Sequence, residues 1–126
     1  MKFLSREAIK NIEKTIQKSY NLPIFKGYKA INKRGLEKLI DELYAHLPED
    51  VEKAREYLRT RNYEIKTNPK KNTLYETIQK LEIKLNEGFP LFAQTIILNI
   101  KDLENLLKEI ENDIPEEILK AEILSK

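Results

Sequence analysis

Residues 23–54 read PIFKGYKAINKRGLEKLIDELYAHLPEDVEKA, and residues 90–121 read PLFAQTIILNIKDLENLLKEIENDIPEEILKA. A shift of 67 positions lays the first stretch on the second without a gap, and 11 of the 32 paired residues are identical. Several other pairs exchange one residue for another of the same kind. A unit of about 60 residues is near the lower limit for folding alone. The repeat therefore predicts two copies that pack on each other.

The length of the chain suits a single domain, 1–126, made of these two copies. We place the first repeat at 5–64 and the second at 73–126. Between them, residues 66–72 read KTNPKKN and hold no apolar side chain, so they form the predicted linker.

Both repeats show helical and extended signals in the same order. Ser5 is a strong N-cap residue and opens the predicted first helix. Tyr28–Ile31 and Thr95–Leu98 hold strand-forming residues, and we expect them to pair across a pseudo-twofold axis, as equivalent segments do in a symmetric dimer. Asn32 and Asn99 then follow as N-caps of the next helix in each copy.

A leucine-rich stripe follows each of these caps with the i, i+3, i+4, i+7 and i+11 spacing of a helix face turned to the core. Each stripe ends before a proline, Pro48 or Pro115, so we expect the helix to stop there and a third helix to begin. Gly88 follows the second repeat's first helix, where a C-cap glycine belongs. The predicted repeat core consists of Leu36, Leu39, Ile40, Leu43, Leu47, Leu103, Leu106, Leu107, Ile110 and Ile114.

These patterns predict a mainly α fold. It consists of two tandem repeats, each with a helix, an extended segment and two further helices. The repeats are expected to pack as a pseudo-twofold intramolecular dimer, with one small two-stranded sheet formed by the extended segments.

The composition excludes several classes of protein. The chain has no cysteine, so it has neither disulfides nor thiolate metal sites. Its start is too short an apolar run for a signal peptide, and no stretch holds the ~18 uninterrupted apolar residues of a transmembrane helix. We therefore expect a cytoplasmic protein, with association to a membrane surface as the variant that a basic patch would allow.

The net charge of +2 is unevenly distributed. Residues 1–63 carry 14 basic against 9 acidic side chains, and residues 64–126 carry 9 against 12. Opposite charges permit attraction between the two halves, or head to tail between molecules. Drift between two diverged copies is the alternative interpretation.

Recognisable catalytic chemistry is absent from the sequence. There is no phosphate loop, dinucleotide fingerprint, zinc-protease motif or calcium loop. His46, the only histidine, lies at a predicted helix end, where it is expected to interact with free carbonyls rather than act in catalysis. Asp41 and Glu42 are adjacent on a helix and point apart. We expect a protein that is not an enzyme, with no catalytic residue, no cofactor and no metal.

One patch has the composition of a binding surface, because it combines aromatic and basic side chains. Such a combination binds anionic lipid headgroups or a nucleic-acid backbone. The alternative places Phe25 and Tyr28 in the core, while the lysines solvate a sheet edge. The patch comprises Phe25, Lys26, Tyr28, Lys29, Lys33 and Arg34.

Residues 12–60 resemble a family of small bacterial coiled-coil proteins. The shared pattern is a proline-led extended segment, here LPIFKGYKAIN, followed by the leucine-rich LEKLIDELYAHLPEDVEKAREYL. The family includes DivIVA-like cell-division proteins of cyanobacteria and chains similar to the ATP-synthase b subunit. The resemblance implies a self-associating, non-enzymatic scaffold or adaptor in cell division or at the envelope. This chain differs in carrying two copies and in stopping without a long coiled-coil tail.

Two functional hypotheses follow from the sequence. In the first, the chain is a non-enzymatic interaction module that binds another protein or associates with itself. In the second, it is a peripheral module that uses the basic patch to bind an anionic membrane or, less favoured, a nucleic acid. An enzyme is the third and least supported option.

Overall fold

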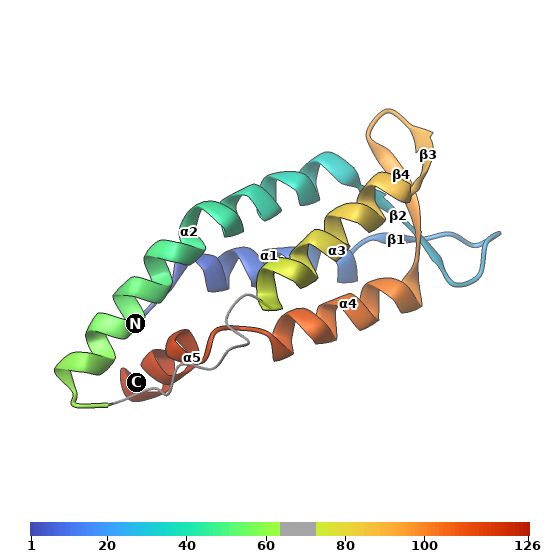
Figure 1. Ribbon diagram of the computed structural model, residues 1–126. Helices are drawn as coiled ribbons and strands as arrows, with labels where there is room; N and C mark the ends of the chain where they lie inside the picture. Colours follow the sequence, from blue (N-terminus) through green and yellow to red (C-terminus); the bar gives the residue numbers. More distant parts are fainter. Residues whose placement is uncertain (64–72) are drawn as a thin grey trace.

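The computed structural model describes residues 1–63 and 73–126 (Figure 1). The mainly helical class is confirmed, and a small antiparallel sheet stands at one end. The helices are α1 (Leu4–Gln17), α2 (Lys33–Thr60), α3 (Thr73–Glu87), α4 (Ile100–Asn112) and α5 (Glu116–Leu124). The strands are β1 (Tyr20–Asn21), β2 (Tyr28–Asn32), β3 (Phe89–Phe92) and β4 (Thr95–Asn99). The predicted linker at 66–72 lies outside the described residues.

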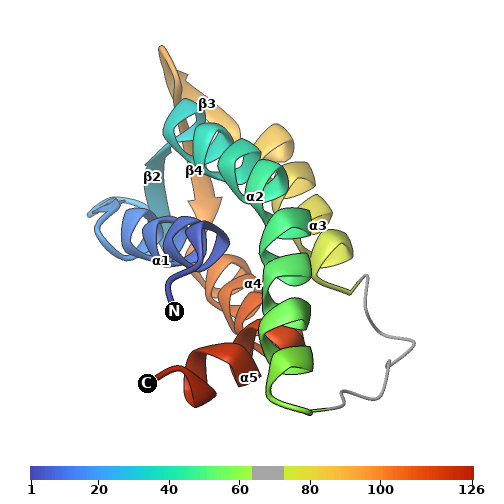
Figure 2. The same ribbon diagram turned by 90° about the vertical axis from the view of Figure 1, so that its left-hand side faces the viewer.

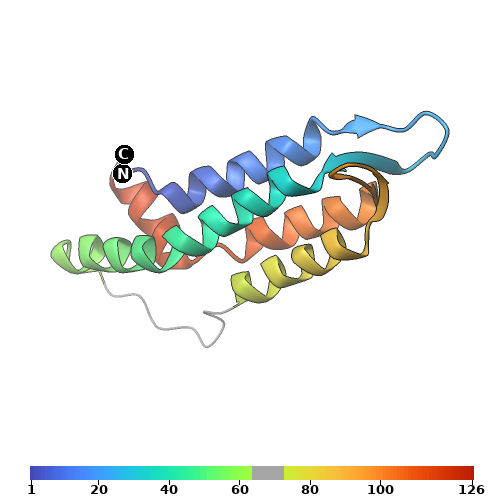
Figure 3. The same cartoon turned by 90° about the horizontal axis from the view of Figure 1, so that it is seen from above.

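The helices form a bundle that extends away from the sheet. Helices α1 to α4 run side by side in alternating directions (Figures 1 and 3). Seen from the end opposite the sheet, they surround a common interior (Figure 2). Helix α5 packs on α2 at this end, where the two chain termini also lie (Figure 1). The bundle therefore has a sheet end and a terminal end.

The interior is filled by stripes from all five helices. Eight of the ten residues of the predicted repeat core are buried, and Leu39 and Leu107 are half-buried against that core. The first helix of each half adds further large aliphatic residues, which are Ile9, Ile12 and Ile16 from α1 and Leu74, Ile78, Leu81 and Leu85 from α3.

The predicted pairing of the two extended segments is confirmed, but the sheet has four strands rather than two. Its order is β1-β2-β4-β3, and antiparallel β2 and β4 form the centre with Ala30 opposite Ile97. A loop over residues 22–27 and a tight turn over residues 93–94 fold the preceding residues back onto the central strands. Gly27 (φ 86°) lies in the loop and Ala93 (φ 48°) in the turn. These connections create the edge strands β1 and β3, neither of which was predicted as a separate strand.

The link between sheet and helices is the same in both halves. Asn32 accepts a hydrogen bond from the Gly35 backbone at 3.0 Å, and Asn99 accepts one from the Asp102 backbone at 3.2 Å. The two predicted N-caps are therefore confirmed. They fix the point at which each central strand turns into a helix.

The predicted helix break at Pro48 is wrong, whereas the break at Pro115 is confirmed. Helix α2 is 28 residues long and continues through Pro48, although proline supplies no backbone donor. Its buried stripe continues on one face through Leu47, Ala54 and Leu58, so packing on both sides of the proline holds the helix together. In the second half, α4 ends at Asn112 and α5 begins at Glu116.

A polar contact accompanies the break in the second half. Asp113 is the C-cap residue of α4, and its Oδ2 accepts a hydrogen bond from Thr77 Oγ1 of α3 at 2.7 Å. The first half has His46 at the equivalent position. His46 lies inside α2 instead of at a helix end, so its expected role at free carbonyls is wrong.

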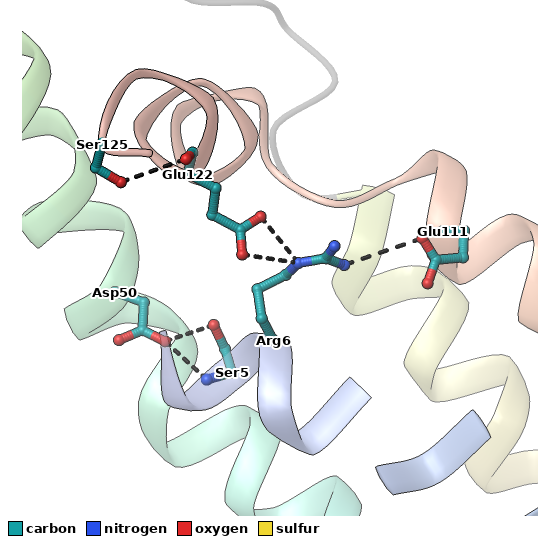
Figure 4. A network of polar contacts seen from close by, with 6 residues as sticks. All are labelled: Ser5, Arg6, Asp50, Glu111, Glu122 and Ser125. Carbon is teal, nitrogen blue, oxygen red and sulfur yellow. Dashed lines mark hydrogen bonds and ion pairs between the residues drawn. The ribbon is translucent and has the colours of Figure 1, made fainter. Parts of the chain in front are cut away.

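The prediction that Ser5 caps the first helix is also wrong. Helix α1 begins at Leu4 with Phe3 as its N-cap residue, and the Phe3 side chain makes no capping hydrogen bond. Both the backbone N–H and the hydroxyl of Ser5 donate to Asp50 Oδ2 on α2, the N–H at 2.8 Å (Figure 4). A buried carboxylate of another helix thus satisfies the start of α1.

Gly88 follows α3 as predicted, but it does not have the left-handed conformation of a C-cap glycine, which among the described glycines only Gly27 adopts. A Cβ at Gly88 would lie 2.9 Å from Ile96 Cδ1 and 3.1 Å from Leu98 Cδ2. Glycine is therefore required here because α3 approaches β4 closely.

Candidate interaction surface

The sheet has one face toward the bundle and one face that no helix covers (Figure 1). Successive side chains on a strand point to opposite faces. Ile31 of β2 and Ile96 and Leu98 of β4 are buried, so they belong to the face that packs on the helices. Ala30 and Ile97 alternate with them and point away from the bundle.

The strand register places a row of apolar residues across this uncovered face. Tyr20 pairs with Ala30, Ala30 pairs with Ile97, and Ile97 pairs with Phe89. Residues directly opposite in an antiparallel pair lie on the same face. The row therefore ends in an aromatic ring at each sheet edge, with Tyr20 67% exposed and Phe89 69% exposed.

Two further aromatic residues belong to the same face. Phe92 pairs with Thr95 and is 68% exposed, and Tyr28 pairs with Asn99 and is also exposed. None of the outward strand positions is charged, although 35% of the chain is. We name these positions the outer sheet face, which comprises Tyr20, Tyr28, Ala30, Asn32, Phe89, Phe92, Thr95, Ile97 and Asn99.

The residues of the predicted anionic-surface patch lie at this same end, on the β1–β2 hairpin and at the start of α2. Phe25 and Tyr28 are both exposed, so the interpretation that places them in the core is wrong. Lys26 in the hairpin turn and Arg34 in the first turn of α2 are exposed or partly exposed as well. These four side chains are available to a partner.

The other two patch residues are less available. Lys29 Nζ donates to the carbonyl oxygens of Ile16 at 3.0 Å and Gln17 at 3.4 Å, which are the last residues of α1. It thereby neutralises free carbonyls at a helix C-terminus, a structural role. Lys33 is the first residue of α2 and is partly buried.

The strands and the residues beside them carry more basic than acidic side chains. Residues 14–36 and 88–101 contain all four strands and carry seven basic side chains without one acidic side chain. Glu87 and Asp102 lie directly outside these acid-free ranges. The rest of the chain carries 16 basic against 21 acidic side chains. The sheet end is therefore positive, and it favours a partner that is negatively charged.

Sequence reasoning missed Tyr20 and Phe89 as surface residues. Each lies on an edge strand, and the second hairpin turns at Ala93-Gln94, which lacks the glycine or asparagine typical of such turns. The available signal was the repeat itself, because aligned central strands predict that the segments before them fall at the two sheet edges.

A second polar cluster lies at the terminal end of the bundle (Figure 4). Arg6 Nε of α1 lies 3.1 Å from Glu122 Oε1 of α5, and Arg6 Nη1 lies 3.9 Å from Glu111 Oε2 of α4. The pKa of the nearby Glu13 is raised from 4.5 to about 7. The largest cause is burial, and the hydrogen bond to Glu111 and the negative charge of Glu111 contribute less. The cluster ties three helices together and makes their packing sensitive to pH.

No cluster of metal-ligating side chains occurs in the described part of the chain. Residues 1–63 and 73–126 contain no group of three or more potential metal-ligating side chains. None of their helices has both the length and the apolar character needed to cross a bilayer. Neither a family model, a curated protein nor a solved structure matches this chain.

Proposed function

We propose that this protein is a non-enzymatic interaction module, an adaptor or scaffold, that binds its partner through the outer sheet face. The observation that carries the proposal is the aromatic, charge-free row that ends in Tyr20 and Phe89. Burial of an aromatic side chain is strongly favourable. A face with this composition and no covering helix is a binding surface rather than a solvated one.

The finer proposal is that the two halves are copies of one unit, related by a pseudo-twofold axis through the Ala30–Ile97 pair. Three observations support it. The two paired residues are themselves equivalent under the shift of 67 positions. The backbone N–H of Lys33 donates to Gln94 O at 2.8 Å, and the N–H of Ile100 donates to Gly27 O at 2.8 Å. These two hydrogen bonds exchange under the same shift.

The third observation concerns the first helices. The five buried residues of α1 correspond to the five buried residues of α3 with a constant shift of 69 positions. This shift is two positions larger than the shift of 67 in the main repeat. The difference arises between the first helix and the central strand of each half, where the β1–β2 hairpin is longer than the β3–β4 hairpin. An axis of this kind presents the two edge aromatics in equivalent positions. The buried positions are Ser5, Ala8, Ile9, Ile12 and Ile16 in α1, and Leu74, Thr77, Ile78, Leu81 and Leu85 in α3.

Another protein is the partner that the sequence favours, and the resemblance to DivIVA-like proteins suggests a role in cell division or at the envelope. Self-association through the outer sheet face alone is disfavoured, because two positive sheet ends repel each other. Self-association by another face is compatible with the proposal.

Site-specific photocrosslinking tests the binding face. A photoreactive phenylalanine analogue is placed at Phe89 and, as the matched control, at Ile83 of α3, which is 55% exposed but lies on the side of the bundle. We expect discrete crosslinked products in native cells from position 89 and not from position 83. Equal products from both positions, or none from position 89, would count against the proposal.

A second candidate function is peripheral binding to an anionic membrane surface. It is supported by Ile24 at the tip of the β1–β2 hairpin, which is 84% exposed beside Phe25 and Lys26. An apolar tip flanked by a lysine suits the headgroup region of an anionic bilayer. Sedimentation with anionic vesicles, compared with neutral ones, tests it. Binding that survives Ile24→Glu together with Lys26→Glu would exclude this use of the hairpin.

A further inference from the structure

We propose that the outer sheet face binds single-stranded nucleic acid, with bases stacked on its exposed aromatic rings and phosphates held by the basic side chains around it. The inference rests on the proposed function for its binding face, because it keeps the outer sheet face as the surface that binds. It differs in the ligand, which is an unpaired polynucleotide in place of a protein partner.

The aromatic residues supply the first argument. Tyr20 and Phe89 lie on opposite edge strands of one row, so about 14 Å separates them at the usual strand spacing of ~4.8 Å. Phe92 extends the same face along β3. Exposed rings spread over the face of a sheet are a platform on which successive bases stack, irrespective of sequence.

The centre of the row is compatible with this use. Ala30 and Ile97 lie between the two edge rings and are only partly exposed. An apolar strip bounded by exposed rings suits the faces of planar bases. The absence of charge on the strip also leaves the bases in a site where stacking is not opposed by desolvation of an ion.

The surrounding charge supplies the second argument. Four exposed basic residues flank the strands in sequence. Residues 14–36 and 88–101 contain no acidic residue. A polynucleotide carries a negative charge on every phosphate, and basic grooves that follow its backbone are the usual complement to a stacking platform. The four residues are Lys18, Lys26, Arg34 and Lys101.

The two arguments together select the single-stranded form. In a duplex the bases are already stacked on each other, so the exposed rings gain nothing from it. Charge alone would favour the duplex, because its charge density is higher. Tighter binding of the unpaired strand would therefore indicate stacking on the aromatic rings. Tighter binding of the duplex would indicate that only the lysine and arginine side chains contribute.

Fluorescence anisotropy with the purified full chain tests the inference. The probes are labelled oligothymidine and oligouridine of about 12 nucleotides, within the ~4–16 nucleotide sites of single-strand binders, and a duplex of the same length. We expect tighter binding of a single strand than of the duplex, and affinity that falls as salt rises. Absence of binding at low salt, or equal or tighter duplex binding, would overturn the inference.

Variants identify the surface that binds. Phe89→Ala is expected to weaken single-strand binding roughly tenfold, whereas Phe89→Tyr retains it, because a ring is still present for stacking. Ile83→Ala on α3 is the exposed control and is expected to leave affinity unchanged. Circular dichroism verifies that each variant is folded. Equal affinities of Phe89→Ala and Ile83→Ala would exclude stacking at this position.

Charge variants separate phosphate binding from stacking. Lys26→Glu and Arg34→Glu are expected to weaken binding and to reduce its salt dependence by about 0.7 in the logarithmic slope for each phosphate that the variant no longer neutralises. The crosslinking experiment at Phe89 distinguishes the two proposals. Products from position 89 without oligonucleotide binding overturn the nucleic-acid inference and leave the interaction module in place. Failure of both experiments removes both proposals.

Discussion

The strongest single polar interaction between α1 and α2 is predicted to be the one that Asp50 makes with Ser5. Asp50 is buried on α2, and its Oδ2 accepts the backbone N–H of Ser5 at 2.8 Å and the Ser5 hydroxyl at 2.5 Å. Substitution Asp50→Ala removes the acceptor of two buried donors. It also removes a negative charge from the positive end of α1.

The magnitude follows from these terms. Leaving buried donors without a charged acceptor costs about 1.5–3 kcal/mol, and the lost helix-end interaction adds about 0.3–1 kcal/mol. Removing the buried carboxylate also removes its own desolvation penalty, which offsets part of the loss. We therefore expect Asp50→Ala to lower the free energy of unfolding by about 2–3 kcal/mol, or Tm by roughly 10 °C for a chain of this length.

Urea unfolding followed by circular dichroism measures this free energy. Asp50→Asn keeps an acceptor without the charge and is expected to cost about 1 kcal/mol, as is Ser5→Ala, which removes only the hydroxyl. Glu49→Ala, at the exposed neighbouring position, is the control. If Asp50→Ala cost no more than Glu49→Ala, the assignment of Asp50 as the cap of α1 would be refuted.

Three further predictions concern other positions. Gly88→Ala is expected to destabilise the fold by about 1–3 kcal/mol, because its Cβ would crowd Ile96; an unchanged urea midpoint would contradict this. Pro48→Ala is expected to stabilise α2 by about 1 kcal/mol by restoring a backbone donor, and a lower Tm would contradict it. The raised pKa of Glu13, about 7, means that its proton stabilises the fold below about pH 4.5 and that this contribution is lost as pH rises through 7. Because the side chain is half-buried and screened, Glu13→Gln should gain about 1 kcal/mol near pH 8 and nothing near pH 4; equal effects at both pH values would contradict the shift.

The features of the fold that depend on local signals were predictable from the sequence. Asn32 and Asn99 cap their helices because a cap is a contact within one turn. The pairing of β2 with β4 was predicted from the proposed repeat, and the strand register confirms the pairing. These predictions required no knowledge of the contacts between helices.

The features that failed depend on contacts between distant segments. Pro48 and Pro115 have similar neighbours in sequence, yet only the second ends a helix, because packing on both sides of Pro48 outweighs one lost hydrogen bond. Serine is a preferred N-cap residue, but both donors of Ser5 bond to the carboxylate of Asp50, 45 positions away.

The candidate site was predicted only in part, for a related reason. The basic residues, Phe25 and Tyr28 were identified from composition. Tyr20 and Phe89 were not, because their exposure depends on hairpin turns that bring them to the sheet edges. Composition therefore indicated the end of the molecule proposed to bind, and the strand register indicated the face.

The central pair of the sheet has a consequence for synthesis of the chain. Strand β2 emerges from the ribosome long before β4 exists, so a nascent first half displays an unpaired strand edge and the open side of α1 and α2. Until its own β4 arrives, that edge can accept the β4 of a neighbouring chain on the same message, giving a domain-swapped product. Rapid, uninterrupted translation of the second half protects against this exchange.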